Sequence, residues 1–348
     1  MTYISVCLFR HEMEAGTEQR ITLRKLAELC ELAPTTVSSI LHGRKTYCSQ
    51  AKIERVKSLV KEYNYRPNIG YNIMTGRETN IIAVVFSQKR VTQHEMLRNL
   101  YMNICVGLNE RNYAMYTAIL TGDDEEQMSM LRSLEERGCR AFLFIGTPKN
   151  FDGISAYLKS RDLRFIGFNN SKTEDGIFAD QSSAYIRYLD ILELGGRTNI
   201  RFALTKDYME NTIFKKLSES RRLLYRDACM NVPHDEYVQG NSASHYYQRG
   251  YQQAKDELRR NSGLEALIFP TDYHVLGAAS ALAEFGRSPD AVELFGMDDA
   301  ASVCFTKVRM TTTRFDMDSI AEKLIERLVA PVSGIEIIPG EIVHYPIA

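Results

Sequence analysis

The sequence predicts a two-part protein: a small all-α helix-turn-helix unit, followed by an α/β core of two doubly wound parallel-sheet lobes. Residues 21–67 hold three short amphipathic helical patterns. From Asn80 onward, short apolar runs alternate with helical patterns, which is typical of parallel sheets covered by helices. The length of 348 residues is consistent with two or three folded units.

The first helical pattern begins after Thr22, whose hydroxyl can cap a helix by accepting a backbone N–H. Apolar side chains between residues 23 and 30 then share one helical face. A turn is expected at residues 31–33, and Pro34 suits the first position of the second helix because the N–H it lacks would be unpaired there. The third helix is expected to start after Ser49 and to stop before Pro67.

The charge of the chain is unevenly distributed. Residues 21–66 carry nine Lys or Arg against four Glu, a balance of +5, and the first twenty residues carry −1. The remaining 282 residues therefore carry −5, since the whole chain carries −1. The polar face of the second helix consists of short hydroxyl side chains. A basic unit with such a face favours contact with DNA phosphates, whereas the alternative is a three-helix bundle without a ligand.

The core is expected to contain an alternating series of strands and helices, with a second set beginning near residue 179. The expected strands are 81–86, 114–119, 141–145, 165–168, 200–203, 266–269 and 293–296. The expected helices are 95–112, 125–137, 154–160, 183–194, 216–229, 247–261 and 275–285. No Gly-x-Gly-x-x-Gly or Walker motif is present, so a nucleotide-binding fold is not supported.

Composition excludes several classes of protein. No apolar stretch of about 18 residues is present, so no membrane span is expected. The seven cysteines are scattered without Cys-x-x-Cys spacing, which indicates a reducing cytoplasm and no metal cluster. The seven histidines show no ligand spacing and no Cys or Ser partner, so no metal, cofactor or catalytic residue is predicted. Residues 1–20 fit no motif, and a disordered extension, an added helix and an upstream start codon all remain open.

The helical unit resembles the headpiece of the lactose/galactose-repressor (LacI/GalR) family of bacterial transcription regulators. The matching residues are Thr22-Leu23-x-x-x-Ala27, Thr36-Val37-Ser38-x-x-Leu41, Arg55-Val56 and Asn64-Tyr65-Arg66-Pro67-Asn68. The match continues to the C-terminus and leaves out only the first 20 residues. The sequence departs from the family pattern at Glu31, Ala33 and Ser39, where relatives usually have Gly, Ser and Arg, and these departures bear on the operator sequence that is read.

The resemblance implies a domain organisation. It gives an N-terminal extension (1–20), a helix-turn-helix domain (21–67), a hinge (68–79) and a periplasmic-binding-protein-like core (80–348). Its N-lobe would hold about 80–178 and 312–330, and its C-lobe about 179–311 and 331–348. In the family the hinge becomes helical on DNA and wedges an apolar side chain into the minor groove, a role that falls on Met74; a plain linker is the alternative.

The residues expected to contact DNA lie on the first two helices and the hinge. They are Thr22, Ala33, Pro34, Thr35, Thr36, Ser38, Ser39, His42, Asn68, Tyr71 and Met74.

Polar residues at expected strand and helix ends match the family's effector positions. They are Ser87, Asn169, Arg222, Thr271, Asp272 and Asp298, the last within Gly296-Met297-Asp298-Asp299. Each alone could be a helix cap or a turn residue. Together they predict a site between the lobes, since ligands of such sheets bind at the carboxyl ends of the strands. A carboxylate, an Arg and hydroxyl or amide groups suit a sugar or sugar derivative.

The sequence therefore predicts a cytoplasmic, homodimeric transcription regulator, and repression is its favoured mode of action. Its partners would be double-stranded operator DNA and a small polar effector. The alternatives are a cytoplasmic sugar-binding protein and a sugar-acting enzyme with a helical appendage. A sugar-acting enzyme would need two carboxylates at a defined separation, and nothing in the sequence places a pair of carboxylates at such a separation.

Overall fold

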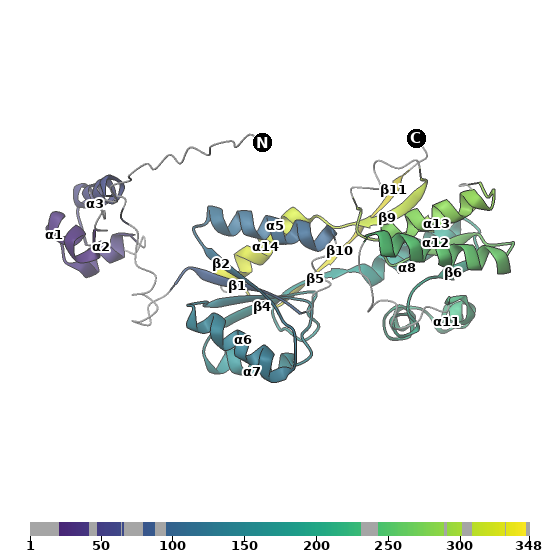
Figure 1. Cartoon of the computed structure of the whole chain (residues 1–348), viewed down its shortest axis with the longest axis horizontal. Coiled ribbons are helices and arrows are strands. Elements are labelled where there is room, and N and C mark those ends of the chain that lie inside the picture. The colour runs from purple at the N-terminus through teal and green to yellow at the C-terminus, as the bar shows by residue number, and fades with distance from the viewer. Residues whose placement is uncertain are drawn as a thin grey trace, which may run out of the picture. The chain divides into compact units, whose positions relative to one another are not determined.

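The chain divides into two compact units, Met1–Arg77 and Glu78–Ala348, which are described separately (Figure 1). The computed structural model describes residues 21–41, 47–63, 65, 79–87, 95–230, 243–288, 291–300, 308–330 and 332–345. The predicted residues His42, Asn68, Tyr71 and Met74 lie outside these ranges.

The first unit contains three described helices, α1 (Leu23–Leu29), α2 (Pro34–Leu41) and α3 (Gln50–Glu62). Its core gathers the apolar faces of all three helices, namely Leu26, Ala27, Cys30, Val37, Val56, Leu59 and Tyr65. Thr22 caps α1, because its Oγ1 accepts a hydrogen bond of 3.2 Å from the Lys25 backbone N–H. Glu31, in the turn between α1 and α2, has a φ of 52°, a conformation that favours glycine.

The first lobe of the second unit is built on a six-stranded sheet, in which all neighbouring strands are parallel. Its order is β10 (Ile335–Pro339), β5 (Gly176–Asp180), β4 (Arg164–Phe168), β3 (Ala141–Ile145), β1 (Ile81–Phe86) and β2 (Ala114–Ile119). Helices α5 (Glu95–Glu110) and α14 (Met317–Val329) cover one face. Helices α6 (Asp124–Glu136) and α7 (Phe151–Ser160) cover the other, so β1 is buried along its whole length.

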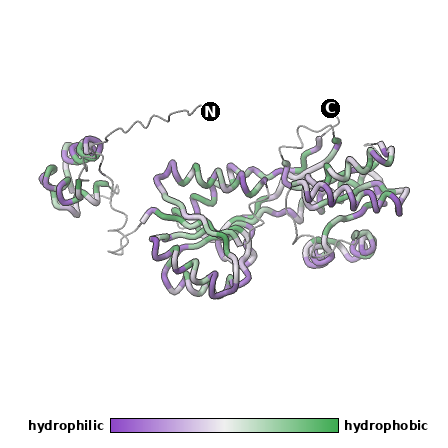
Figure 2. The backbone as a smooth tube through the Cα atoms, viewed as in Figure 1, coloured by the Kyte–Doolittle hydropathy of each residue, from purple (hydrophilic) through white to green (hydrophobic). Residues whose placement is uncertain are grey.

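The second lobe is built on a five-stranded sheet. Its order is β11 (Glu341–Tyr345), β9 (Met310–Arg314), β8 (Glu293–Phe295), β7 (Ala266–Ile268) and β6 (Ile200–Phe202). Helix α8 (Gln181–Leu194) packs on one face, and α12 (Ala243–Arg260) and α13 (Asp272–Glu284) pack on the other. Hydrophobic segments run through the middle of both lobes, and hydrophilic residues lie on the outer sides of their helices (Figure 2). The prediction of a wholly parallel sheet is wrong at one edge of this lobe, where β11 pairs antiparallel with β9.

Three segments cross between the lobes: β5 leads into α8, β9 into α14, and β10 into β11. The expectation that residues 331–348 belong to the second lobe is wrong for β10, which pairs with β5 in the first sheet. Residues 312–314 were expected in the first lobe, yet they belong to β9 of the second sheet. Strand pairing between distant segments decides both assignments, and periodicity along the chain does not report it.

The single helix expected at 216–229 is interrupted. The chain forms a π-helical turn (Met209–Ile213) after α9 (Lys206–Tyr208), then α10 (Phe214–Lys216), α11 (Glu219–Tyr225) and a 3₁₀ turn (Arg226–Ala228). Leu217 and Ser218 between α10 and α11 are extended, with ψ values of 150° and 160°. Leu217 lies at the interruption between α10 and α11, and its side chain is buried in the second-lobe core.

Candidate functional sites

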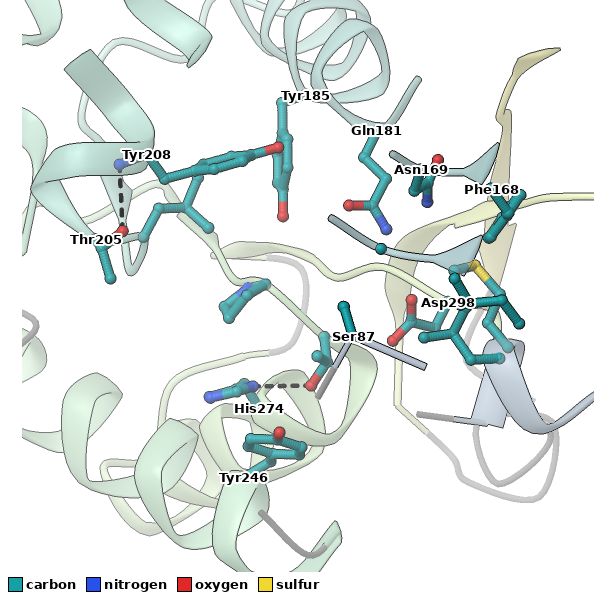
Figure 3. A pocket seen from close by; sticks show the side chains of 17 residues that line it. Ser87, Phe168, Asn169, Gln181, Tyr185, Thr205, Tyr208, Tyr246, His274 and Asp298 are labelled. Atoms are coloured by element: carbon teal, nitrogen blue, oxygen red, sulfur yellow. Dashed lines mark hydrogen bonds between the residues drawn. The ribbon is translucent and has the colours of Figure 1, made fainter. Parts of the chain in front are cut away.

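A cavity of about 410 Å³ lies between the two lobes of the second unit (Figure 3). Both lobes contribute to it, and most polar residues stand at the ends of strands or at the starts of helices. Its lining residues are Ser87, Met96, Leu97, Ile145, Gly146, Phe168, Asn169, Gln181, Tyr185, Leu204, Thr205, Tyr208, Tyr246, Pro270, Thr271, His274 and Asp298. Its size and its mixture of apolar and polar lining are those of a small-molecule site.

The wall from the first lobe is mainly apolar, with two polar side chains at strand ends. Ser87 follows β1, and its Oγ is buried without a hydrogen-bond partner among the described residues. Gly146 makes room for it, because a Cβ there would lie 2.4 Å from that Oγ and the φ of Gly146 is +80°. Asn169 follows β4, and its Oδ1 accepts a hydrogen bond of 2.7 Å from the Ala179 backbone N–H. A buried hydroxyl without a partner favours a ligand that supplies one.

The wall from the second lobe carries three tyrosines, Tyr185, Tyr208 and Tyr246, and one histidine (Figure 3). Tyr185 and Tyr208 meet edge to face with ring centroids 6.1 Å apart. Burial, followed by the neighbouring Asp180 charge, raises the pKa of Tyr208 to about 12, so its phenol is neutral at physiological pH. Tyr246 stacks on His274 at 5.1 Å, and the His274 Nδ1 lies 2.8 Å from the Thr271 Oγ1.

Two glycines allow Tyr246 and His274 to meet. Helices α12 and α13 approach so closely that a Cβ at Gly250 would lie 1.9 Å from the His274 carbonyl oxygen. A Cβ at Gly277 would lie 1.9 Å from the Tyr247 carbonyl oxygen. The close helix crossing therefore depends on the absence of side chains at both positions, and it sets the ring stack at the cavity wall.

Asp298 reaches the cavity from a turn with an unusual backbone. Asp298 and Asp299 have φ values of 95° and 47°, in the region that L-residues seldom adopt. Asp272 holds this turn: its Oδ2 accepts a 2.8 Å hydrogen bond from the Ala300 N–H, and its Oδ1 accepts a 2.7 Å bond from the Thr312 Oγ1. Such a turn persists only where its surroundings impose it, and Asp272 provides two of these constraints.

Two of the residues expected to bind the effector do not line the cavity. Asp272 is fully buried behind the Asp298 turn, and burial raises its pKa well above the usual range of an Asp, although its two hydrogen bonds oppose that shift. Arg222 lies on α11, where its Nε donates a 3.0 Å hydrogen bond to the Leu217 carbonyl oxygen. The break in the expected helix at Leu217 gives Arg222 this carbonyl as a partner.

Ser87, Asn169, Thr271 and Asp298 do line the cavity. Sequence reasoning missed the tyrosines, Gln181 and His274. Gln181 could have been found, since it directly follows β5. The tyrosines occupy helix positions whose spacing is that of ordinary core residues, so no pattern along the chain marks them.

The first unit presents a hydroxyl-rich hollow of about 630 Å³ between α2 and the start of α3. Its lining residues are Leu32, Thr35, Thr36, Ser39, Tyr47, Cys48, Ser49 and Lys52. Ser39 bonds within its own helix, because its Oγ donates a 3.0 Å bond to the Thr35 carbonyl oxygen. Tyr47, which the sequence analysis did not select, is fully exposed. Ala33 and Pro34 are exposed beside this surface, and Ser38 is half-buried on α2.

The described residues contain neither a metal-binding cluster nor a membrane-spanning helix. No group of three or more His, Cys, Asp or Glu side chains could hold a metal ion. None of the described helices combines the length and apolar character that crossing a bilayer requires.

Fold and sites together define a ligand-binding core of two α/β lobes joined to a helix-turn-helix unit. A family model described as "Periplasmic binding protein-like domain" matches residues 192–347. The HTH-type transcriptional regulator AscG of Escherichia coli K12 is 22% identical over 324 residues, covering 90% of this chain and 92% of AscG.

Solved structures give the same fold. The lac repressor dimer bound to operator and an anti-inducer aligns with a TM-score of 0.68 at 17% identity, covering 93% of this chain and 98% of the repressor chain. A complex of the transcriptional regulator CelR with cellobiose aligns with a TM-score of 0.56 at 19% identity, covering 93% of this chain and 99% of CelR. Together these matches support a transcription regulator of the LacI/GalR type.

Proposed function

We propose that this regulator is a cytoplasmic homodimer that represses transcription by binding a pseudo-palindromic operator, and that a sugar or sugar derivative in the inter-lobe cavity controls its affinity for DNA. The observation that carries this proposal is the cavity itself. Its Asp298 carboxylate and the Ser87 hydroxyl, which has no hydrogen-bond partner within the described part of the chain, come from different lobes. A ligand that bonds to both would favour one angle between the lobes.

DNA contact is assigned to α2 and its surroundings. The residues Thr35, Thr36, Ser38 and Ser39 of α2 and the neighbouring Tyr47 offer hydroxyls for phosphates or base edges. Lys52, at the start of α3, adds a charge that a phosphate would neutralise. The balance of +5 over residues 21–66 supports the same assignment, and binding should weaken steeply as salt rises.

A sugar is favoured as effector by the chemistry of the cavity. Hydroxyl, amide and carboxylate groups lie beside tyrosine rings and aliphatic walls, which suits a ligand with many hydroxyls and some apolar surface. The CelR relative was solved with cellobiose, so a related fold holds a sugar. Coupling to DNA can be no larger than the ligand's differential affinity for the two lobe angles, typically about 1–3 kcal/mol.

Dimerisation is supported by an apolar surface on the first lobe. Met102 and Val106, which lie one turn apart on α5, are both more than half exposed. Large apolar side chains that cluster at a surface commonly mark a protein interface. A homodimer would also supply two helix-turn-helix units for a two-fold symmetric operator.

The role assigned to this protein is binding without turnover. Asp298 lines the cavity, but Asp272 is fully buried and bonded to Thr312 and Ala300, and Asp299 pairs with Arg314. Glycoside hydrolysis needs a second carboxylate facing the substrate. The described lining offers Asp298 as its one carboxylate, which supports a binding site without catalytic residues, cofactor or metal.

The experiment combines DNA binding with a ligand panel. The full-length protein is tested in gel shifts with genomic fragments, then with neutral and charged sugars, and each sugar is checked for turnover. Asp298→Ala should lose the ligand response and keep ligand-free DNA binding, because the truncated side chain loses charge-assisted bonds to ligand hydroxyls. Turnover of a sugar would favour the enzyme alternative. A confirmed ligand that binds Asp298→Ala as tightly as the parent would contradict the site.

A further inference from the structure

The described lining of the cavity holds no lysine and no arginine. Its charged side chain is Asp298, and its other polar groups are hydroxyls, amides and one imidazole, that of His274. The Tyr208 phenol is neutral at physiological pH, as shown above. The described part of the wall therefore offers an anion no guanidinium or ammonium partner.

Three basic side chains of the second lobe are engaged away from the described cavity lining. The Arg314 Nε donates a 2.5 Å bond to Asp299, whose other oxygen accepts a 2.6 Å bond from the Tyr345 hydroxyl. The Lys216 Nζ donates bonds of 2.9 and 3.0 Å to the two Asp180 oxygens. Arg222, the residue expected to reach the cavity, is bonded to a main-chain carbonyl on α11.

Asp298 is the carboxylate that faces the cavity. Asp272 is fully buried behind its turn, with a pKa raised by burial, and the charge of Asp299 is paired with Arg314. A phosphate or carboxylate in the cavity would face the Asp298 charge and lose its hydration without gaining an opposite charge from the described lining. Burying an unpaired charge is costly, and building such a mismatch is a recognised way of rejecting a competing ligand.

From these observations we infer that the cavity selects an uncharged polyhydroxylated ligand with an apolar face, and that it rejects the phosphorylated and uronic acid forms of the same sugar. This inference rests on the proposed effector site and specifies the class of its ligand. Asp298 would accept hydroxyl protons from the ligand, while Tyr185, Tyr208 and Tyr246 would contact its apolar face.

Matched sets of sugars test the inference by calorimetry on the full-length protein at constant ionic strength. One set is glucose, glucose 6-phosphate and glucuronate; a second is galactose, galactose 6-phosphate and galacturonate; maltose and cellobiose test length. Where the neutral member of a set binds, it should bind at least about 100-fold more tightly than either anion, since the anion leaves a buried charge unpaired.

Asp298→Asn tests the source of the selectivity. Asparagine tolerates positive φ, so the turn should be kept. The variant should weaken the neutral sugar and narrow its advantage over the anion at least about tenfold. Asp152→Asn is the control: it removes the same charge from an exposed position on α7, paired with Lys172, and should leave the ratio unchanged.

The outcomes distinguish failure of the charge selectivity from failure of the proposed effector site. An anion that binds as tightly as its neutral partner overturns the inference and leaves the proposed effector site standing. An unchanged ratio in Asp298→Asn overturns the role of Asp298 in charge selection. Binding of no sugar in any set contradicts the proposed sugar effector itself, while DNA binding is measured separately.

Discussion

The two units of this chain build their candidate binding surfaces in different ways, although both use hydroxyl-bearing side chains. The first unit makes a small core from helices that are close in sequence, and the hydroxyl-rich surface between α2 and α3 comes from residues 32–52. The second unit builds its cavity from residues between 87 and 298, which meet only after two sheets have formed. A surface made from one local segment can be recognised along the chain, whereas a cavity assembled from many segments depends on how the strands pair.

Removing the first unit gives the largest expected effect on this comparison. A protein lacking residues 1–68 should lose operator binding entirely, because the hydroxyl surface and the basic charge are lost together. Its ligand affinity, measured by calorimetry, should stay within about twofold of the parent, since the core has its own hydrophobic clusters. DNA binding by the truncated protein would contradict the assignment of DNA binding to the first unit and ligand binding to the second.

Gly250→Ala tests whether the α12/α13 crossing sets the cavity wall. The new Cβ would lie 1.9 Å from the His274 carbonyl, so the helices must separate. We expect a loss of about 1–3 kcal/mol in the free energy of unfolding of the core, together with weakened ligand binding. Gln248→Ala, at an exposed site of the same helix, is the control for helix propensity. Urea unfolding and calorimetry measure both effects, and a fully stable variant with normal ligand affinity would contradict the crossing as described.

Asp272→Asn tests the buried carboxyl behind the Asp298 turn through its pH dependence. Burial raises the pKa of Asp272, with the Asp298 and Asp299 charges adding to the rise. The native state then holds this proton more tightly than the unfolded chain, in which the pKa is about 3.9. The stabilisation that the protonated Asp272 carboxyl gives to the folded state is therefore complete below about pH 4, and it falls as the pH rises towards the native pKa.

The asparagine variant cannot titrate, so the difference in unfolding free energy between variant and parent should shift in favour of the variant as the pH rises from about 4. Denaturant unfolding at a series of pH values gives this difference. A constant difference across the range would mean that the Asp272 carboxyl has the same pKa in both states.

Glu31→Gly gives the smallest expected effect and concerns the first unit. Glu31 has a φ of 52° between α1 and α2, where glycine avoids the steric cost that a side chain brings. The substitution should stabilise the helical unit by about 1 kcal/mol, measured by hydrogen exchange of its amides in the full-length protein. Glu28→Gly, inside α1, should do the opposite by a similar amount because glycine is a poor helix former. Equal signs for the two variants would contradict the turn geometry.

Much of the fold could be predicted because local pattern and tertiary role agree. The strand over residues 81–86 is an unbroken apolar run, and the structure buries it on both faces as part of a parallel sheet. The prediction failed where local pattern carries no information about pairing. Residues 335–339 join the first sheet beside β5, and residues 341–345 join the second as an antiparallel edge.

The sequence by itself indicated most of the alternating strands and helices between residues 81 and 296, the basic helix-turn-helix unit and the resemblance to the family, because each depends on short-range periodicity, caps and spacing. It also placed Ser87, Asn169, Thr271 and Asp298 at element ends that reach the cavity. Only the tertiary structure decided that Asp272 supports the turn, that Arg222 lies elsewhere, and that three tyrosines and His274 complete the wall. Those roles depend on which distant segments pack together, since a side chain's partners are set by sheet order and helix crossing and not by its neighbours in the chain.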